Sequence, residues 1–270
     1  MSWMSYTFRP HLTAIDDCLD CGGDSSITYA LVDAGQIPEF VEKVGAWMAD
    51  SPRELLFERS FARSALHLSP MLIQLLAPSE QRHRQLEALD DACRHLPVLS
   101  VINAPMSLEH LIEHLRSLML IEADDSPYLL RFADSQSFSA VNAAFTPEQR
   151  ATFFSSVRHW WSVDHAGVLH DHTCNLAAPR STSAVAPLPL RFEGAAVDAL
   201  LSAAAGPILA SQLRHLDDTF GRALSHAEQV TFATDCLGLI EECDVDSDID
   251  STSFALRRWR ERIDGKRAAI

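Results

Sequence analysis

The sequence predicts an α/β N-terminal lobe, with helices packed on a mixed sheet, followed by a smaller all-helical C-terminal lobe. Short β-prone runs alternate with amphipathic helical patterns from Ile27 to Trp161, which is typical of α/β lobes. Residues 175–190 then read NLAAPRSTSAVAPLPL, with three prolines and no period, which is typical of a linker. Only helical patterns follow this segment.

These observations divide the chain into four parts. A chain of 270 residues exceeds the roughly 150 residues of a common single domain, so two lobes are expected. The parts are an N-terminal tail over residues 1–26, an α/β lobe over 27–170, a linker rich in Pro, Ser and Ala over 171–190, and a helical lobe over 191–270.

Individual elements follow from length and periodicity. Strands are expected at short β-prone runs: Ile27–Val32, Glu54–Glu58, Met71–Leu76, Val98–Ile102, Leu118–Glu122 and Tyr128–Phe132. Helices are expected where apolar residues recur at 3.6 spacing or where a capping box opens a run. They cover Ile37 to Met48, Leu108 to Leu115, Thr146 through Phe153, Phe154 and Val157, Ala195 to Leu216 with an interruption near Gly206 and Pro207, Ala227 to Cys243, and Ser253 to Ile263.

The bulk composition excludes several classes of protein. A net charge of -15 disfavours a nucleic-acid partner held by phosphate contacts. The acidic N-terminal segment has no continuous apolar core, so no secretory signal is expected. The apolar stretch from Ala199 to Ala210 is shorter than the roughly 20 residues that cross a bilayer, so no membrane span is expected. Six scattered cysteines favour reduced thiols.

The segment Asp33-Ala34-Gly35 follows the first strand, where a nucleotide-binding fold carries its phosphate loop. A dinucleotide site needs Gly-x-Gly-x-x-Gly and a P-loop needs Gly-Lys-Ser/Thr, and neither is present. Asp33 is therefore expected to be a polar residue at a strand end, bonded to the turn or to a neighbouring cation. A nucleotide-binding regulator stays a third alternative, and no cofactor is predicted.

The densest group of metal-ligating residue types is His165, His170, Asp171, His172 and Cys174. Imidazole and thiolate are good zinc ligands, but the spacing matches neither His-Glu-x-x-His nor a paired Cys-x-x-Cys. On a strand His170 and His172 would share a face. The expected structure is a polar segment that leaves the α/β lobe, and a metal-dependent hydrolase built on this group is the alternative function.

Three further patterns contain residue types that occur in binding sites. Cys18-Leu-Asp-Cys21 is a single pair, which does not by itself define a zinc or redox site. The alternating Asp244, Asp246, Asp248 and Asp250 lack the glycine and the glutamate of a calcium loop, so they are expected to be solvated, with the last ones near a helix N-terminus. The helix that follows carries Arg257 and Arg258 among other cations, either as ordinary placement toward a helix end or as a docking face for an acidic partner.

Six segments in order carry a resemblance to a known family. They are YALVDAGQIPEF, ELLFERS, SPMLIQLL, VLSVINAPMSLEHLIEHLRSLMLIE, YLLRFADSQSF and TPEQRATFFSSVRHWW. Together they resemble the type VI secretion effector chaperones, also called adaptors. The family pattern Arg-Phe-x-Asp-Pro stands here as Arg131-Phe132-Ala133-Asp134-Ser135, without the proline. Arg131 is expected to reach Asp134, and Asp33 if their strands are neighbours, and all three are read as structural.

The resemblance implies a function. Such a protein is a cytoplasmic chaperone that binds a toxin, holds it soluble and delivers it to the trimeric VgrG spike protein, with no catalytic residues and no cofactor. The expected cargo site is a groove between the lobes, bordered by Trp160, Trp161, the Pro/Ser linker and the first C-terminal helix, because a linked two-lobe chain offers a cleft there. Aromatic residues are also common interface anchors. The alternative is that both tryptophans are core residues.

Overall fold

The computed structural model describes residues 6–21, 26–37, 39–93, 96–155, 157–164, 166–174, 186–242 and 250–267. The chain forms two compact units, Met1–Val197 and Asp198–Ile270. Each unit has its own hydrophobic core and is considered by itself below.

Unit 1 is built on a six-stranded sheet in the order β2-β3-β1-β4-β7-β8. Its strands are β1 (Ile27–Val32), β2 (Arg53–Leu55), β3 (Met71–Gln74), β4 (Leu99–Ala104), β7 (His159–Val163) and β8 (Leu169–Asp171). Every neighbouring pair in this sheet is antiparallel. The combination of this sheet with the helices described below confirms the α/β class.

A second sheet has three strands, in the order β6-β5-β9. These are β5 (Leu120–Ala123), β6 (Ser126–Leu129) and β9 (Leu190–Phe192). β5 pairs with β6 antiparallel and with β9 parallel, so this smaller sheet is the mixed one. A strand is present at each of the six expected places, although most are shorter than expected and several are shifted by one or two residues. Strands β7, β8 and β9 were not expected.

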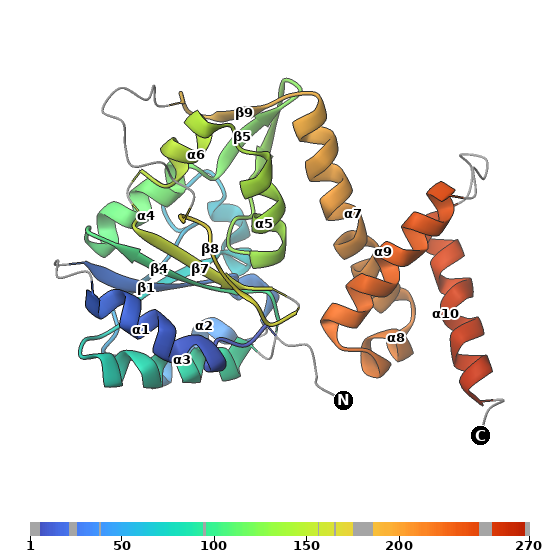
Figure 1. Ribbon diagram of the computed structural model, residues 1–270, viewed down its shortest axis with the longest axis horizontal. Coiled ribbons are helices and arrows are strands. Elements are labelled where there is room, and N and C mark those ends of the chain that lie inside the picture. Colours follow the sequence, from blue (N-terminus) through green and yellow to red (C-terminus); the bar gives the residue numbers. More distant parts are fainter. Residues whose placement is uncertain are drawn as a thin grey trace. The chain divides into compact units, whose positions relative to one another are not determined.

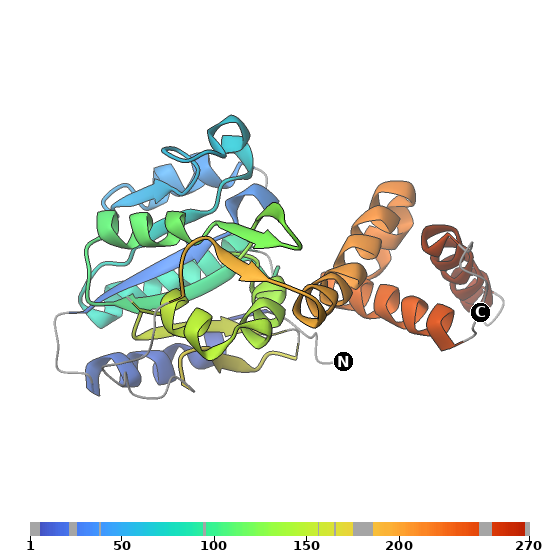
Figure 2. The same ribbon diagram turned by 90° about the horizontal axis from the view of Figure 1, so that it is seen from above.

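The helices of unit 1 cover both faces of the larger sheet (Figures 1 and 2). The α-helices are α1 (Leu12–Cys21), α2 (Phe40–Trp47), α3 (Ser79–Cys93), α4 (Leu108–Ser117), α5 (Ser135–Ala144) and α6 (Pro147–Phe153). Three 3-10 helices accompany them: η1 (Arg9–His11), η2 (Ala34–Gln36) and η3 (Arg63–Leu68). The Thr146 capping box opens α6 as expected, but α6 ends at Phe153 and Val157 follows it.

Strand alternation gives the sheet two buried faces. Residues such as Val101 and Trp161 pack with α1, α2 and α3 in one core cluster. On the other face Trp160 joins a group of aromatic rings that includes Phe138, whose centroid lies 4.8 Å away, and Phe153 at 5.5 Å. Because successive side chains of a strand point to opposite faces, Trp160 and Trp161 belong to different layers.

The expected N-terminal tail is wrong, because residues 6–21 are packed into unit 1. Phe8, Leu12 and Ile15 are buried in the core cluster. Asp16 lies on the same helix and accepts a hydrogen bond from Arg82 Nε at 2.8 Å. The spacing of the three apolar residues is that of one helix face, and the neighbouring aspartates obscured it in the sequence.

The expected linker also differs from the structure. Residues 171 and 190 belong to strands of unit 1, and the boundary between the units falls at 197/198 instead of 190/191. Residues 175–185, which carry most of the linker-like composition, lie outside the described residues.

Unit 2 contains α7 (Ala195–Leu216), α8 (Asp218–Ala223), α9 (His226–Glu242) and α10 (Ser251–Arg267), with the first three residues of α7 in unit 1. α7 is continuous through Pro207, so the expected interruption is wrong. A proline removes one backbone hydrogen bond, and a helix of this length retains the rest. Asp250 caps α10 by accepting hydrogen bonds from the amides of Thr252 and Ser253, as expected, and Asp244, Asp246 and Asp248 lie outside the described residues.

Among the described residues, α7 is the one helix long and apolar enough to cross a membrane by length and composition. One such helix is weak evidence, since core helices of soluble proteins share these properties. Leu209, Ala210 and Leu213 of α7 are buried in the core of unit 2. The helix is longer than the apolar stretch from Ala199 to Ala210, because it continues through Pro207.

Candidate functional site

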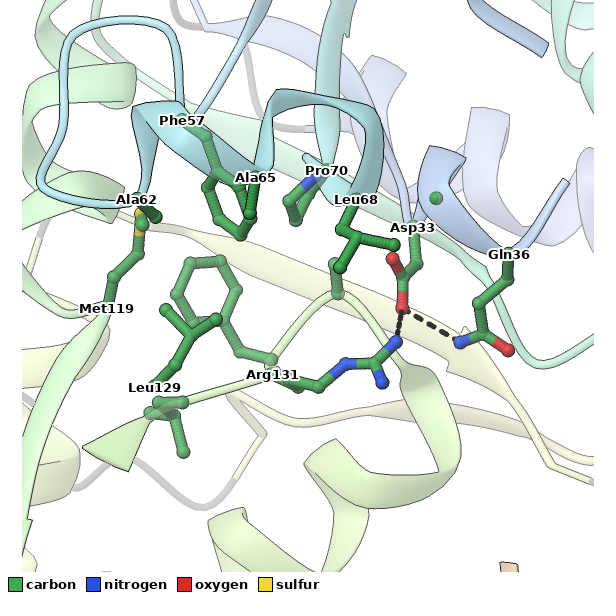
Figure 3. A pocket seen from close by; sticks show the side chains of 14 residues that line it. Asp33, Gln36, Phe57, Ala62, Ala65, Leu68, Pro70, Met119, Leu129 and Arg131 are labelled. Carbon is green, nitrogen blue, oxygen red and sulfur yellow. Dashed lines mark hydrogen bonds and ion pairs between the residues drawn. The ribbon is translucent and has the colours of Figure 1, made fainter. Parts of the chain in front are cut away.

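A pocket of about 250 Å³ opens in unit 1 between two segments that are far apart in the sequence (Figure 3). One wall comes from the segment between β2 and β3, which includes η3. The other wall comes from Met119 just before β5, from Leu129 at the end of β6, and from the segment that follows β6. The lining is mainly apolar: Phe57, Ala62, Ala65, Leu68, Pro70, Met119, Leu129, Leu130, Phe132 and Ala133, with Asp33, Gly35, Gln36 and Arg131 at one end.

Gly35 allows the two 3-10 helices beside the pocket to touch. A Cβ atom at Gly35 would lie 2.6 Å from Cα of Leu68 and 2.9 Å from its carbonyl carbon. Contacts of that length with backbone atoms do not occur, so any side chain here forces η2 and η3 apart. The glycine in the strand-turn-helix segment therefore serves a close backbone approach, not a phosphate.

Arg131 and Asp33 form an ion pair at the polar end of the pocket. Nη2 of Arg131 donates to Oδ2 of Asp33 at 2.6 Å, and Gln36 Nε2 donates to the same oxygen at 2.8 Å. The Asp33 side chain is 3% exposed and the Arg131 side chain 56% exposed. The predicted contact between these residues is confirmed, although loops rather than neighbouring strands bring them together.

The two partners differ in what they can offer a ligand. Burial lowers the pKa of Arg131, but the charge and hydrogen bond of Asp33 outweigh it and the net direction is upward. The guanidinium is therefore a permanent cation at the pocket mouth, with donors beyond the one that Asp33 accepts. Asp33, by contrast, is almost closed off from solvent.

Asp134 has a different role from the one expected. Its Oδ1 accepts hydrogen bonds from the amides of Gln136 and Ser137, at 3.1 and 3.2 Å, so it is the N-cap of α5. Ser135 occupies the first helical position, where the family pattern has proline and where proline is well tolerated. The Ser135 amide donates to the carbonyl of Pro97 at 2.9 Å, a bond that proline cannot make.

Exposed apolar side chains continue the pocket onto the surface. Leu68 and Leu129 line it and are 51% and 40% exposed. Phe61 and Leu66 each adjoin a lining residue in the sequence and are 62% and 38% exposed. We call these four residues, Phe61, Leu66, Leu68 and Leu129, the apolar rim. Grouped exposed apolar residues of this kind mark interaction sites on soluble proteins.

Trp160 and Trp161 are not part of any exposed surface. Their exposed fractions are 0% and 4%, and they lie in the two opposite cores described above. The expectation that they anchor cargo is therefore withdrawn, because a partner cannot reach either indole in this structure. The alternative, that both are core residues, agrees with their burial.

The histidine-rich group divides among separate partners. His170 and His172 do share a face, with ring centroids 6.3 Å apart, but His170 bonds to Asp164 and His172 to Ser162, each at 2.7 Å. Asp171 points the other way, to His159. His165 lies outside the described residues. Within the described part of the chain, no three His, Cys, Asp or Glu side chains are grouped so as to hold a metal ion.

Arg257 and Arg258 lie on the exposed surface of α10 in unit 2. Arg258 Nη1 is 3.4 Å from Glu261 Oε2, within the same helix. Exposed pairs of this kind contribute little to stability. Both residues are exposed, and the docking role expected for them stays a prediction.

The pocket and its rim were not expected from the sequence. The sequence draws attention to Arg131, Asp33 and Gly35. The opposite wall itself gives no such sign, because residues 56–70 have no regular hydrophobic periodicity. A signal was present in the glycine: a Gly after a strand that serves no phosphate indicates that another backbone passes close by.

The geometry thus defines an α/β unit with a mainly apolar pocket that has the Arg131 guanidinium at its polar end. Residues 28–152 match the family model described as "Domain of unknown function (DUF4123)". The match covers β1 to α6, the elements that build the pocket. No curated protein and no solved structure matches the chain.

Proposed function

We propose that this protein is a cytoplasmic chaperone or adaptor that binds a type VI secretion effector toxin and delivers it to the VgrG spike. Domains of the matched family are known in adaptors of this secretion system. The six sequence segments that carry the resemblance contribute to the same unit. A protein of this kind acts by binding and needs no cofactor.

The observation that carries the proposal is the apolar rim around the pocket. Its four residues come from two segments more than 50 residues apart in the sequence, and all of them are exposed. Apolar side chains around a concave, mainly apolar pocket are typical of binding hot spots. Arg131 adds a cation, so the bound segment of the toxin is expected to place an acidic group beside an apolar side chain.

The test is capture of the toxin encoded beside this protein, after co-expression. Leu129→Asp and Phe61→Asp place a charge on the rim and are expected to reduce the captured toxin at least about 10-fold, since each replaces apolar burial by a desolvated carboxylate. Toxin that is equally soluble and equally secreted without this protein would refute the chaperone role.

Matched controls exist within the chain. Val41 is 40% exposed, as Leu129 is, and lies in the first turn of α2, where an aspartate is favourable. Leu201 in α7 is 64% exposed, close to the value for Phe61. Val41→Asp and Leu201→Asp are expected to leave capture unchanged. Equal loss in the controls and the rim variants would remove the pocket from the proposal.

Delivery to the spike is a separate step with a separate measurement. Purified VgrG is expected to retain the toxin only when this protein is present. If VgrG binds the toxin equally well alone, the protein is a chaperone without an adaptor role.

A further inference from the structure

A half-buried thiol in α1 lies beside a histidine-aspartate pair on the larger sheet. Cys18 Sγ is 3.8 Å from Nε2 of His159. Nδ1 of His159 is 2.7 Å from Oδ2 of Asp171. The three residues come from α1, β7 and β8, so the fold, not local sequence, brings them together. This group lies outside the pocket assigned to cargo.

The hydrogen bonds fix where the protons lie. Burial raises the pKa of Asp171, but hydrogen bonds from His159 and Thr173 outweigh it and the net direction is downward. An ionised carboxylate only accepts, so Nδ1 of His159 carries the proton. In the neutral imidazole Nε2 is then the acceptor, and the Cys18 thiol can donate to it. The imidazole can therefore take the thiol proton.

The imidazole is also held in place from other sides. It stacks on the indole of Trp161, with ring centroids 4.7 Å apart and planes 4° from parallel. Oδ1 of Asp171 accepts from the amide of Thr173 at 2.9 Å and from its hydroxyl at 2.6 Å. Both ends of the His159–Asp171 pair are thus positioned by packing and hydrogen bonds, as a base next to a nucleophile requires.

The surroundings of Cys18 select among thiol reactions. Acyl transfer needs preorganised donors for an oxyanion, and Cys18 lies in the interior of α1, where backbone amides bond within the helix. Thiol–disulfide exchange needs only a thiolate, access and a disulfide. Cys18 is also the first cysteine of Cys18-Leu-Asp-Cys21, a spacing found at redox sites.

We propose that Cys18 is a redox-active thiol that exchanges with low-molecular-weight disulfides of the glutathione class, with His159 as its base and Asp171 as the residue that positions His159. The Cys18 proton moves to Nε2 of His159. The thiolate attacks one sulfur of the disulfide, an S–S bond to Cys18 forms, and the original S–S bond breaks. The leaving thiolate takes the proton from His159, so Cys18 is oxidised and one half of the disulfide leaves as a reduced thiol.

Two other thiols of the described chain, Cys174 and Cys93, provide comparators. Cys174 is exposed, but burial, the charge and hydrogen bond of Asp171 and the charge of Cys18 raise its pKa. Cys93 is buried and its pKa is also raised, by burial and by the charge of Asp90. Accessibility alone would make Cys174 the most reactive of these thiols, whereas the His159–Asp171 pair favours Cys18.

The test treats the full-length protein, stripped of metal by a chelator, with oxidised glutathione at pH 7, and follows each cysteine by peptide mass. Cys18 is counted as reacted whether it carries glutathione or a disulfide to a second cysteine. It is expected to react at least about 10-fold faster than Cys174. Cys18→Ser is expected to abolish the fast reaction and Cys174→Ser to retain it. A disulfide between Cys18 and Cys174 counts as reaction of Cys18. Glutathione on Cys174 first, or at the same rate as on Cys18, would overturn the proposal.

Substitution of the base separates its chemical role from a structural one. His159→Gln and Asp171→Asn are expected to slow the Cys18 reaction about 10-fold at pH 7. At pH 10 a thiol ionises without a base, since its reference pKa is about 8.5, so the variants are expected to match the parent protein. Continued protection of Cys93 shows that each variant is folded. A Cys18 rate that His159→Gln leaves unchanged at pH 7, or lowers equally at both pH values, would refute the role of His159. Stoichiometric zinc that shields Cys18 before chelation would also refute it.

Discussion

Arg131 Nη2 lies 2.6 Å from Asp33 Oδ2 across a separation of 98 residues, which ties the segment after β6 to the end of β1. The carboxylate is buried and the guanidinium is half exposed. The pair thus holds the polar end of the pocket closed while it presents a cation to solvent.

Arg131→Ala is expected to destabilise the protein by about 2 kcal/mol, because it leaves a buried carboxylate with only Gln36 as a side-chain partner. Asp33→Asn is expected to lower stability before it affects toxin binding. Urea unfolding at pH 7 measures both. Arg131→Lys keeps the charge and is expected to lose less; equal losses for Lys and Ala would show that the charge is not what matters.

Gly35→Ala is expected to lower the free energy of unfolding by about 2 kcal/mol, since the added methyl would overlap the backbone of Leu68. Gly45 provides the matched control. It lies within α2, and a Cβ there would be 3.7 Å from the Arg53 guanidinium, an ordinary contact. Gly45→Ala is expected to stabilise by up to about 1 kcal/mol through helix propensity. Thermal unfolding of the two variants should therefore shift in opposite directions.

Asp134→Ala is expected to lower the free energy of unfolding by about 1 kcal/mol through loss of the α5 cap, whereas Asp134→Asn should be nearly neutral, because asparagine caps as well as aspartate. Burial raises the pKa of Asp134 despite the hydrogen bonds from Ser137. The folded state therefore favours the protonated carboxyl of Asp134. The stability that this preference contributes is present at low pH and is lost as pH rises through the raised pKa. Asp134→Asn should remove this pH dependence of the free energy of unfolding in urea titrations above pH 4. If Asp134→Asn lowers the free energy of unfolding as much as Asp134→Ala does, the capping role is contradicted.

His172 is expected to make the protein sensitive to mild acid. Burial, with the nearby His170 charge, lowers its pKa to about 4, whereas the unfolded chain protonates it near 6.5. Between these values the unfolded state binds more protons, so stability falls as pH drops from 6.5 toward 4, by a contribution on the order of 3 kcal/mol. His226 in unit 2 shifts in the same direction, also to about 4.

The measurement for His172 is the urea midpoint of unit 1 at pH 7, 6 and 5. His172→Gln removes the titrating group and should flatten the dependence, although the hydrogen bonds to Ser162 and Asn142 make some loss of stability at pH 7 expected. Parallel pH curves for the variant and the parent protein would show that His172 does not control this transition.

The sequence predicted the α/β class because β1, β3 and β4 are short apolar runs between amphipathic helices. Such hydrophobic patterns can be read from residues that are neighbours in the sequence. It did not predict β8 and β9, which have three residues each and are stabilised by pairing with distant strands. α1 was missed for a related reason, since its apolar face becomes recognisable only against the sheet that buries it.

For the candidate site, the contact of Arg131 with Asp33 could be predicted from opposite charges at two strand ends. The role of Asp134 could have been predicted as well, because an aspartate before a helical run is a common N-cap. The pocket could not, because its volume depends on how closely η2 and η3 approach. That distance is set by the absence of a side chain at Gly35.

The adjacent residues Trp160 and Trp161 give the protein two built-in optical reporters, one in each layer beside the larger sheet. Trp160 is surrounded by phenylalanine rings, and Trp161 stacks on His159. The chain also contains Trp3, Trp47 and Trp259, so the difference in fluorescence between the parent protein and each Trp→Phe variant would isolate one indole and follow the melting of its layer. Different denaturant midpoints for the two differences would show that the layers loosen separately.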